Sequence, residues 1–231
     1  MKECIILAGG LGTRLQSVVS DVPKCMALVA GKPFLSYLFD YAAEQGFDHL
    51  ILSLGYKSEV VLLWLEDKQF PFKVSYVIED SPLGTGGAIK LAFEKVSGDS
   101  SFVFNGDTFF DVDTDLLKRF HEENEASVSL ALKPMVDFDR YGSVDINSRG
   151  RITLFNEKQY CKAGLINGGV YVINQDIFSR LDLNDKFSFE KDILEAHIKN
   201  LVICGYEQNG YFIDIGIPSD FEKANIDFRN R

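Results

Sequence analysis

The segment Leu7-Ala8-Gly9-Gly10-Leu11-Gly12-Thr13-Arg14-Leu15 places three glycines and an arginine directly after an apolar run over residues 3–8. A short apolar run that ends in glycines is typical of a buried strand followed by a turn. Glycines let the backbone approach a ligand closely, successive N–H groups form a nest for an anion, and a guanidinium binds phosphate oxygens. The segment is not a Walker A loop, since no Gly-Lys-Ser/Thr follows, and it is not the dinucleotide fingerprint, since Leu15 replaces the third glycine. A glycine-rich turn with a surface arginine is the alternative.

Outward from this segment, strand-like and helix-like stretches alternate through the first half of the chain. The expected strands cover residues 3–8, 49–54, 72–78 and 102–105, and the expected helices cover 34–45, 58–68 and 85–96. This order predicts a Rossmann-like α/β fold with a mostly parallel sheet flanked by helices. Because ligands bind beyond the carboxyl ends of such strands, the loops 9–14, 79–87 and 105–107 are expected to converge.

After about residue 107 the pattern changes to strands with few helices between them. Strands are expected over 127–132, 143–146, 152–155, 169–173, 201–204 and 211–215, with helices over 116–121, over 189–199 and from Pro218 onward. No repeat, low-complexity tract or linker separates the halves. We expect a single domain over 1–231, in which a β-rich part (about 111–231) completes a site on the first part (about 1–110).

The composition excludes several classes of function. With 24 Lys+Arg against 34 Asp+Glu, the net charge is −10, which argues against a nucleic-acid or anionic-membrane partner. No apolar stretch approaches the ~18 residues of a membrane span. The four cysteines form no CxxC pair, so a reducing, cytoplasmic setting is expected. Monomer and small homo-oligomer both remain open.

The glycine-rich segment, taken together with Pro23-Lys24, resembles the sugar-nucleotide pyrophosphorylases. These nucleotidyltransferases join a nucleoside triphosphate to a sugar 1-phosphate, and their fold is the nucleotide-diphospho-sugar transferase type. The resemblance implies that Arg14 and Lys24 bind the triphosphate. It also implies a nucleotide-binding role for the loop residues Leu7, Ala8, Gly9, Gly10, Gly12 and Thr13. Cys25 departs from the family, which usually has a second proline or a small polar residue there. Taken alone, Lys24 would more often be a solvated surface lysine, which is the alternative for this residue.

The segment from Glu79 to Ala88, between a strand and a helix, resembles the part of the family that holds the base. A carboxylate at Glu79 suits guanine, whose N1–H and N2–H₂ are donors on one edge, and would repel the O2 and O4 acceptors of a pyrimidine. With Gly84 and Thr85, the segment is similar to the guanylyltransferase pattern Glu…Pro-Leu-Gly-Thr. Thr85 as a helix cap is compatible with this role.

Two aspartates match the family's metal motifs. Asp107 ends the segment Asn105-Gly106-Asp107, and Asp214 begins Asp-x-Gly-x-Pro. The resemblance implies that they hold Mg²⁺, which typically takes only one or two carboxylates besides phosphate oxygens and water. Asp111, Asp113 and Asp115 form a second acidic cluster, and we expect them to favour the start of a helix instead.

The second half carries the motifs of the sugar side. Tyr141-Gly142 resembles the element whose glycine contacts the sugar, and Glu157-Lys158 resembles the pair that binds sugar hydroxyls and the 1-phosphate. The strand containing Asn167 and Gly168 resembles the one that closes over the sugar. Gln159 follows Lys158 where relatives often have proline, and a surface ion pair is the alternative for Glu157-Lys158. The three histidines have no spacing that suggests a metal site or a triad.

Within the family, residues 131–135, 137–142, 164–169 and 187–190 are similar to the D-glycero-α-D-manno-heptose 1-phosphate guanylyltransferases. The implied reaction transfers GMP from GTP to the sugar 1-phosphate, as a supply of GDP-heptose for capsule, lipopolysaccharide or S-layer glycans. A mannose 1-phosphate guanylyltransferase and another hexose 1-phosphate nucleotidyltransferase are alternatives. A regulatory module that only binds a sugar nucleotide is a further alternative, but such a protein should have lost a metal aspartate or a phosphate-binding cation, and all are present here. A glycosyltransferase is another alternative, because Asp111-Val112-Asp113 matches its Asp-x-Asp motif superficially, but glycosyltransferases lack the glycine-rich segment with Arg14.

Overall fold

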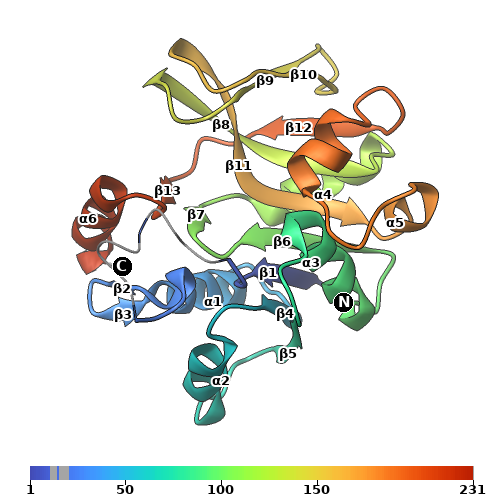
Figure 1. Cartoon of the computed structure of the whole chain (residues 1–231). Helices are drawn as coiled ribbons and strands as arrows, with labels where there is room; N and C mark the ends of the chain where they lie inside the picture. The colour runs from blue at the N-terminus through green and yellow to red at the C-terminus, as the bar shows by residue number, and fades with distance from the viewer. Residues whose placement is uncertain (11–14, 16–20, 231) are drawn as a thin grey trace.

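The first half of the chain builds a parallel sheet, as seen in the computed structural model, which describes residues 1–10, 15 and 21–230 (Figure 1). Its strands are β1 (Glu3–Leu7), β4 (His49–Leu54), β5 (Lys73–Ile78) and β6 (Ser100–Asn105), in the spatial order β6-β1-β4-β5. Each neighbouring pair is parallel. The four carboxyl ends therefore lie at the same edge of the sheet, as expected.

Helices cover both faces of this sheet, so successive residues of a strand enter different cores. Cys4 and Ile6 pack into one core with α1 (Phe34–Glu44) and α2 (Ser58–Glu66). Ile5, between them, packs into the other core with α3 (Gly84–Ala92). All three side chains are fully buried. Burial on both faces is the physical reason why β1 is a continuous apolar run and not an alternating one.

The second half extends the sheet with antiparallel strands and one further parallel pair, β8 with β12. Strand β11 (Cys161–Asn174) pairs with β6 and with β8 (Val128–Phe138), which in turn pairs with β12 (Ile203–Glu207). Strands β9 (Ser143–Ile146) and β10 (Ile152–Phe155) form a hairpin beside the first half of β11, at the top of Figure 1. The sheet is mixed, because β6, β1, β4 and β5 are parallel neighbours and β8 is parallel to β12, whereas β11 runs antiparallel to β6, β8 and β9.

Strands β8 and β11 are longer than the sequence pattern predicts. The predictions stop β8 at residue 132 and start β11 at residue 169, because lysine, proline and glycines interrupt the apolar runs there. The structure continues both strands, from Lys133 to Phe138 and from Cys161 to Asn167, as one paired ribbon. This ribbon is largely half-buried or exposed, so hydrophobicity alone did not reveal it.

The remaining elements are short. The helices are α4 (Thr114–Glu123), α5 (Ile177–Arg180) and α6 (Pro218–Asp227), with a π-helical segment η3 (Phe189–Glu195) and 3₁₀ turns η1 (Lys24–Met26), η2 (Phe93–Lys95) and η4 (Phe228–Asn230). Two small sheets pair β2 (Leu28–Val29) with β3 (Lys32–Pro33), and β7 (Thr108–Phe110) with β13 (Phe212–Asp214). The helix predicted over 189–199 ends earlier, at Glu195. No helix in the part of the chain that the structure describes is long and apolar enough to cross a membrane.

A buried polar network fixes the amino ends of the central strands. Oε1 of Glu3 lies 2.9 Å from Nδ1 of His49, whose Nε2 lies 2.8 Å from Oγ of Ser75. The other oxygen of Glu3 accepts hydrogen bonds of 2.9 Å from the backbone N–H groups of Ser97 and Gly98. The network ties β1, β4, β5 and the turn before β6 together at the edge opposite to the loops described next.

Candidate active site

The loops after β1, β5 and β6 open into a common pocket of about 670 Å³. Its lining includes Leu7, Ala8, Gly9 and Gly10 from the first loop, residues from Glu79 to Thr85 from the second, and Asn105, Gly106 and Asp107 from the third. Lys24, Ser53, Tyr56, Glu190 and Gly216 complete much of the wall. The predicted convergence of three loops at the carboxyl edge of the sheet is confirmed for the described residues, which for the first loop are Gly9 and Gly10.

The two aspartates of the metal motifs meet through the small sheet of β7 and β13. Thr108 is paired with Asp214 in this antiparallel pair, and the backbone N–H of Ile215 donates to the carbonyl of Asp107 at 3.0 Å. Asp107 therefore sits at the start of one strand and Asp214 at the end of the other. A pairing of segments about a hundred residues apart brings the carboxylates together.

Lys24 lies between these carboxylates. Its Nζ is 2.6 Å from Oδ2 of Asp107 and 3.5 Å from Oδ1 of Asp214, and only 10% of the lysine side chain is exposed. The lysine projects from η1, a turn whose start is fixed by Pro23. Asp107 and Asp214 receive further hydrogen bonds from the hydroxyl of Thr108 (3.1 Å) and the N–H of Gly216 (2.7 Å). The result is a compact group of one cation and two oriented carboxylates at one end of the pocket.

This group fits a divalent cation such as Mg²⁺. The ammonium of Lys24 shows that both carboxylates can face the same positive charge, and all their ligand atoms are oxygen, as Mg²⁺ prefers. Among the described residues, no group of three or more His, Cys, Asp or Glu side chains could hold a metal. A metal here would therefore depend on two aspartates, with its other ligands supplied by substrate phosphates and water.

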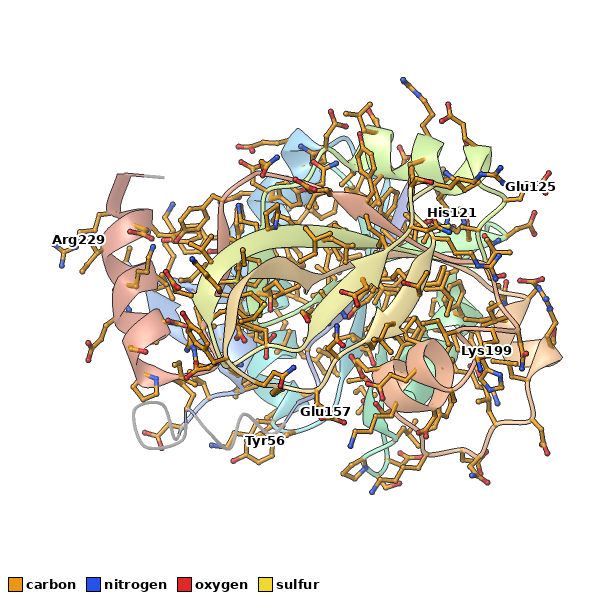
Figure 2. The ribbon with its side chains drawn as sticks, turned by 90° about the horizontal axis from the view of Figure 1, so that it is seen from above. Tyr56, His121, Glu125, Glu157, Lys199 and Arg229 are labelled. Carbon is orange, nitrogen blue, oxygen red and sulfur yellow. The ribbon has the colours of Figure 1, made fainter. Side chains whose placement is uncertain are left out.

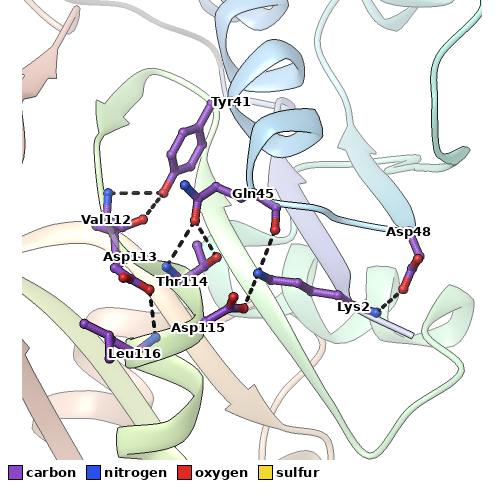
Figure 3. Close-up of polar contacts among 9 residues, drawn as sticks. All are labelled: Lys2, Tyr41, Gln45, Asp48, Val112, Asp113, Thr114, Asp115 and Leu116. Atoms are coloured by element: carbon purple, nitrogen blue, oxygen red, sulfur yellow. Dashed lines mark hydrogen bonds and ion pairs between the residues drawn. The ribbon is translucent and has the colours of Figure 1, made fainter.

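Two aspartates of the second acidic cluster, Asp113 and Asp115, lie at the start of helix α4 (Figure 3). Asp113 caps the helix by accepting a hydrogen bond of 2.9 Å from the N–H of Leu116. Asp115, in the first turn, pairs with the ammonium of Lys2 at 2.6 Å. The expectation that these aspartates favour a helix start is confirmed for Asp113 and Asp115.

Glu79 reaches into the pocket from the end of β5. Its Oε2 accepts a hydrogen bond of 2.9 Å from the N–H of Leu83, while its Oε1 would lie 3.0 Å from a Cβ on Gly9. Burial raises the pKa of the Glu79 carboxyl above its usual 4.5, against the effect of the Leu83 hydrogen bond. The carboxylate is thus held by the loop and placed beside the glycine-rich segment, with its charge partly desolvated.

Cys25, the departure from the family pattern, is buried next to Lys24. Its Sγ donates a weak hydrogen bond to the carbonyl of Ala8 at 3.9 Å. Burial and the nearby charge of Asp107 raise the pKa of this thiol to about 12. Cys25 is therefore a neutral space-filling group that connects the lysine turn to the first loop.

The predicted sugar-side residues lie outside the lining of this pocket. The ring of Tyr141 packs edge-on against Phe212, 6.0 Å between centroids, on the strand that ends with Asp214. Gly142 approaches Asn156 so closely that a Cβ would lie 2.5 Å from its carbonyl oxygen. Glu157 and Lys158, which follow directly, are exposed. Figure 2 shows Glu157 on the side of the molecule where Tyr56, a pocket residue, also lies.

Asn167 and Gly168 lie at a break in the register of β11. Between Asn167 and Tyr171 the pairing with β8 shifts, as in a β-bulge. Gly169 adopts a φ of +72°, and a Cβ there would lie 2.6 Å from the amide nitrogen of Asn105, a pocket residue. The Asn167 amide donates to the hydroxyl of Tyr171 at 2.9 Å. The bulge therefore presses this part of β11 against the third loop of the pocket.

Gly12, Thr13 and Arg14 lie outside the described residues. The structure thus places Leu7, Ala8, Gly9, Gly10, Lys24, Glu79, Gly84, Thr85 and Asp107 in the pocket lining, with Asp214 in contact with Lys24. Asn105 and Glu190 line the pocket too but have no predicted role. Asn105 belongs to the expected loop 105–107, whereas nothing in the sequence predicts that Glu190 lies beside residues about a hundred positions earlier.

Comparisons with known proteins identify the family to which this chain belongs. The chain belongs to the nucleotidyl transferase family, whose model matches residues 3–231. It is 47% identical over 99% of both chains to the D-glycero-α-D-manno-heptose 1-phosphate guanylyltransferase of Aneurinibacillus thermoaerophilus. The Campylobacter jejuni guanylyltransferase of that name is 46% identical over 95% of this chain and 96% of its own. The crystal structure of HddC from Yersinia pseudotuberculosis complexed with GMP-PN superposes with a TM-score of 0.87 at 40% identity, covering 99% of this chain and all of that one.

Proposed function

We propose that this protein is a D-glycero-α-D-manno-heptose 1-phosphate guanylyltransferase that transfers GMP from GTP to the sugar 1-phosphate and releases pyrophosphate. The observation that carries the reaction type is the Lys24–Asp107–Asp214 group at the end of a pocket walled by glycine-rich backbone. Near-full-length identity to two guanylyltransferases of this sugar supports the choice of substrates.

The chemistry is an in-line displacement at the α-phosphorus of GTP. An oxygen of the sugar 1-phosphate forms a bond to that phosphorus, and the bond to the bridging oxygen breaks, so that pyrophosphate leaves with the electron pair. The attacking phosphate is largely ionised at neutral pH, because its second pKa is about 6. No general base is needed, which fits a site without histidine. The protein has to bring two polyanions together and stabilise the charge of the transition state.

Each charged residue then has a distinct task. Lys24 and Arg14 neutralise the triphosphate, and Asp107 and Asp214 hold Mg²⁺, which supplies charge neutralisation at the phosphate oxygens when bound. Lys158 steers the attacking phosphate, and Glu157, Tyr141, Gly142, Asn167 and Gly168 bind the sugar. Because Lys158 is exposed and beyond the pocket lining, we expect its loop to approach the site when the sugar phosphate binds.

Glu79 supports guanine as the base. Its carboxylate lies in the pocket, anchored through one oxygen to Leu83, and can accept hydrogen bonds from the N1–H and N2–H₂ edge of guanine. The product GDP-heptose would be a precursor of capsule, lipopolysaccharide or S-layer glycans. We expect the enzyme to act in the cytoplasm, as a monomer or a small homo-oligomer. One domain, with residues of about 1–110 binding nucleotide and about 111–231 binding sugar, is sufficient for this reaction.

The deciding experiment measures pyrophosphate release by the purified protein with Mg²⁺. GTP, UTP, dTTP, CTP and ATP are crossed with the 1-phosphates of D-glycero-D-manno-heptose, mannose and glucose. Turnover with GTP and the heptose phosphate supports the proposal. Preference for mannose 1-phosphate would overturn the sugar assignment, preference for UTP would overturn the role of Glu79, and no turnover with any pair would indicate a binding module.

A further inference from the structure

The base-binding loop rests on a segment from the second half of the chain, residues 185–190. The N–H of Phe187 donates to the carbonyl of Leu83 at 3.0 Å, and the N–H of Gly86 donates to the carbonyl of Phe187 at 3.0 Å. Leu83 is the residue whose own N–H holds Glu79. The 185–190 segment is therefore one hydrogen bond away from the residue that orients the base-reading carboxylate.

The loop has glycines where the segment touches it. A Cβ on Gly84, whose φ is +74°, would lie 2.5 Å from the carbonyl oxygen of Phe187, and a Cβ on Gly86 would lie 2.2 Å from the Phe187 ring. No side chain fits at these positions without moving the segment. The close contact between the loop and the 185–190 segment therefore depends on glycine at positions 84 and 86.

Glu190 closes this contact through a side-chain hydrogen bond. Oε2 of Glu190 accepts from the hydroxyl of Thr85 at 2.7 Å and from the hydroxyl of Ser188 at 3.0 Å. The Thr85 oxygen in turn accepts from the N–H of Phe189 at 2.9 Å. Thr85 is thereby held from two sides, at the start of α3 and directly after the loop. Glu190 itself lines the pocket.

We propose that Glu190 is a positioning residue for nucleotide selection, which acts through Thr85 to hold the loop that presents Glu79 to the base. This inference rests on the proposed function. The segment belongs to the β-rich part of the chain, so that part contributes to the choice of nucleotide as well as to the sugar side. Hydrogen bonds to a charged acceptor are the strong ones, and losing this one should cost about tenfold in GTP affinity.

The test is a double-mutant cycle with Glu190→Ala and Thr85→Val, read out as the Kd of Mg-GTP and of Mg-UTP by calorimetry without sugar phosphate. Each single variant should weaken GTP binding about tenfold and UTP binding much less. The loss in the double variant should be clearly smaller than the sum of the two single losses, because both single variants remove the Thr85–Glu190 hydrogen bond. In turnover assays the KM for GTP should rise while kcat stays within about twofold, because the variants alter the loop that holds Glu79 and leave Lys24, Asp107 and Asp214 in place.

Two further variants separate positioning from other roles. Glu190→Gln keeps an oxygen that can accept from Thr85 and should recover most of the GTP affinity that Glu190→Ala loses. Glu195→Gln, on the exposed side of the same helix, is the matched control and should behave as wild type. Circular dichroism spectra and melting curves are to be compared with those of the wild type, so that only folded variants are interpreted.

Three results would overturn the proposal: unchanged GTP affinity in Glu190→Ala, additive losses in the double variant, or Glu190→Gln as weak as Glu190→Ala while Thr85→Val binds normally. The last result would indicate that the charged carboxylate of Glu190 interacts with the nucleotide directly and does not act through Thr85. These outcomes are distinct from failure of the proposed function, which appears in the wild-type protein as the absence of turnover with GTP.

Discussion

Nζ of Lys24 lies 2.6 Å from Oδ2 of Asp107, close enough for a charge-assisted hydrogen bond from a lysine whose side chain is largely buried. Asp214 contributes a second carboxylate at 3.5 Å from the same nitrogen. The lysine therefore occupies the region between the two acidic groups that would hold a divalent cation. A cation and this ammonium compete for the same oxygen atoms, and a triphosphate gives the ammonium another anionic partner.

Replacing Lys24 should have opposite effects on catalysis and on metal binding. Lys24→Ala should lower kcat/KM about 100-fold, as expected for the loss of a charge-stabilising group. In the absence of nucleotide the same variant should bind Mn²⁺ more tightly than wild type, because the competing ammonium is gone. Pyrophosphate release and electron paramagnetic resonance of free Mn²⁺ measure the two effects. Lys32→Ala, an exposed lysine, is the control; near-normal turnover in Lys24→Ala would contradict the assignment.

The metal requirement should depend on Asp107 and Asp214 and not on the aspartates of helix α4. Chelation with EDTA should abolish turnover, and added Mg²⁺ should restore it. Asp107→Asn and Asp214→Asn should each lower kcat about 100-fold or more and weaken Mn²⁺ binding. Asp113→Ala should instead reduce the free energy of unfolding by about 1 kcal/mol through loss of its cap and leave the metal titration unchanged. A metal titration altered by Asp113→Ala would contradict this division.

Glu79 should govern both the choice of base and its pH dependence. Glu79→Gln should reduce the preference for GTP over UTP about tenfold or more, because an amide can donate to a pyrimidine carbonyl. Only the ionised Glu79 carboxylate can accept hydrogen bonds through both of its oxygens, because the protonated form carries a hydrogen on one of them. Since burial raises the pKa of Glu79 above 4.5, the KM for GTP should increase on acidification at a pH above that value. The increase should be absent in Glu79→Gln; an identical pH profile in the two proteins would refute the idea.

Glu3 should make the protein sensitive to acid. Burial raises the pKa of Glu3, but hydrogen bonds from His49 and from the N–H groups of Gly98 and Ser97 outweigh it, so the pKa in the folded protein lies below 4.5. A depressed pKa stabilises the fold at pH values above 4.5, and this contribution disappears as the pH falls through the folded value. Urea unfolding between pH 7 and pH 3 should therefore be less pH-dependent in Glu3→Gln than in wild type. At pH 7 the variant should be about 1–3 kcal/mol less stable.

The nucleotide side of the site was largely predictable because its determinants are local. A strand, a glycine-rich loop and a polar residue at a strand end are contiguous in sequence, and the parallel order of β1, β5 and β6 dictates that their loops meet. The position of Asp107 followed from this rule. The position of Asp214 beside it did not, because it depends on the pairing of β7 with β13, two strands of only three residues each.

The β-rich part was less predictable for a physical reason. The first half of β11 pairs with β8 and β9 on a ribbon with little buried surface, so its residues carry no clear hydrophobic pattern. The contact between Thr85 and Glu190 spans 105 residues and uses backbone groups, glycines and a hydroxyl. Such a contact leaves no periodic signal in a single sequence, and only the folded chain shows it.

The pairing of Phe138 with Cys161 has a practical consequence for engineering. These residues are partners at the end of the β8–β11 ribbon, so the 22 residues between them, which include β9 and β10, begin and end at neighbouring points. That excursion carries Tyr141, Gly142, Glu157 and Lys158 together. Exchanging this segment between relatives that use different sugars would transfer four of the six residues proposed for the sugar side through two adjacent junctions, while Asn167, Gly168 and the nucleotide-binding part of the chain stay unchanged.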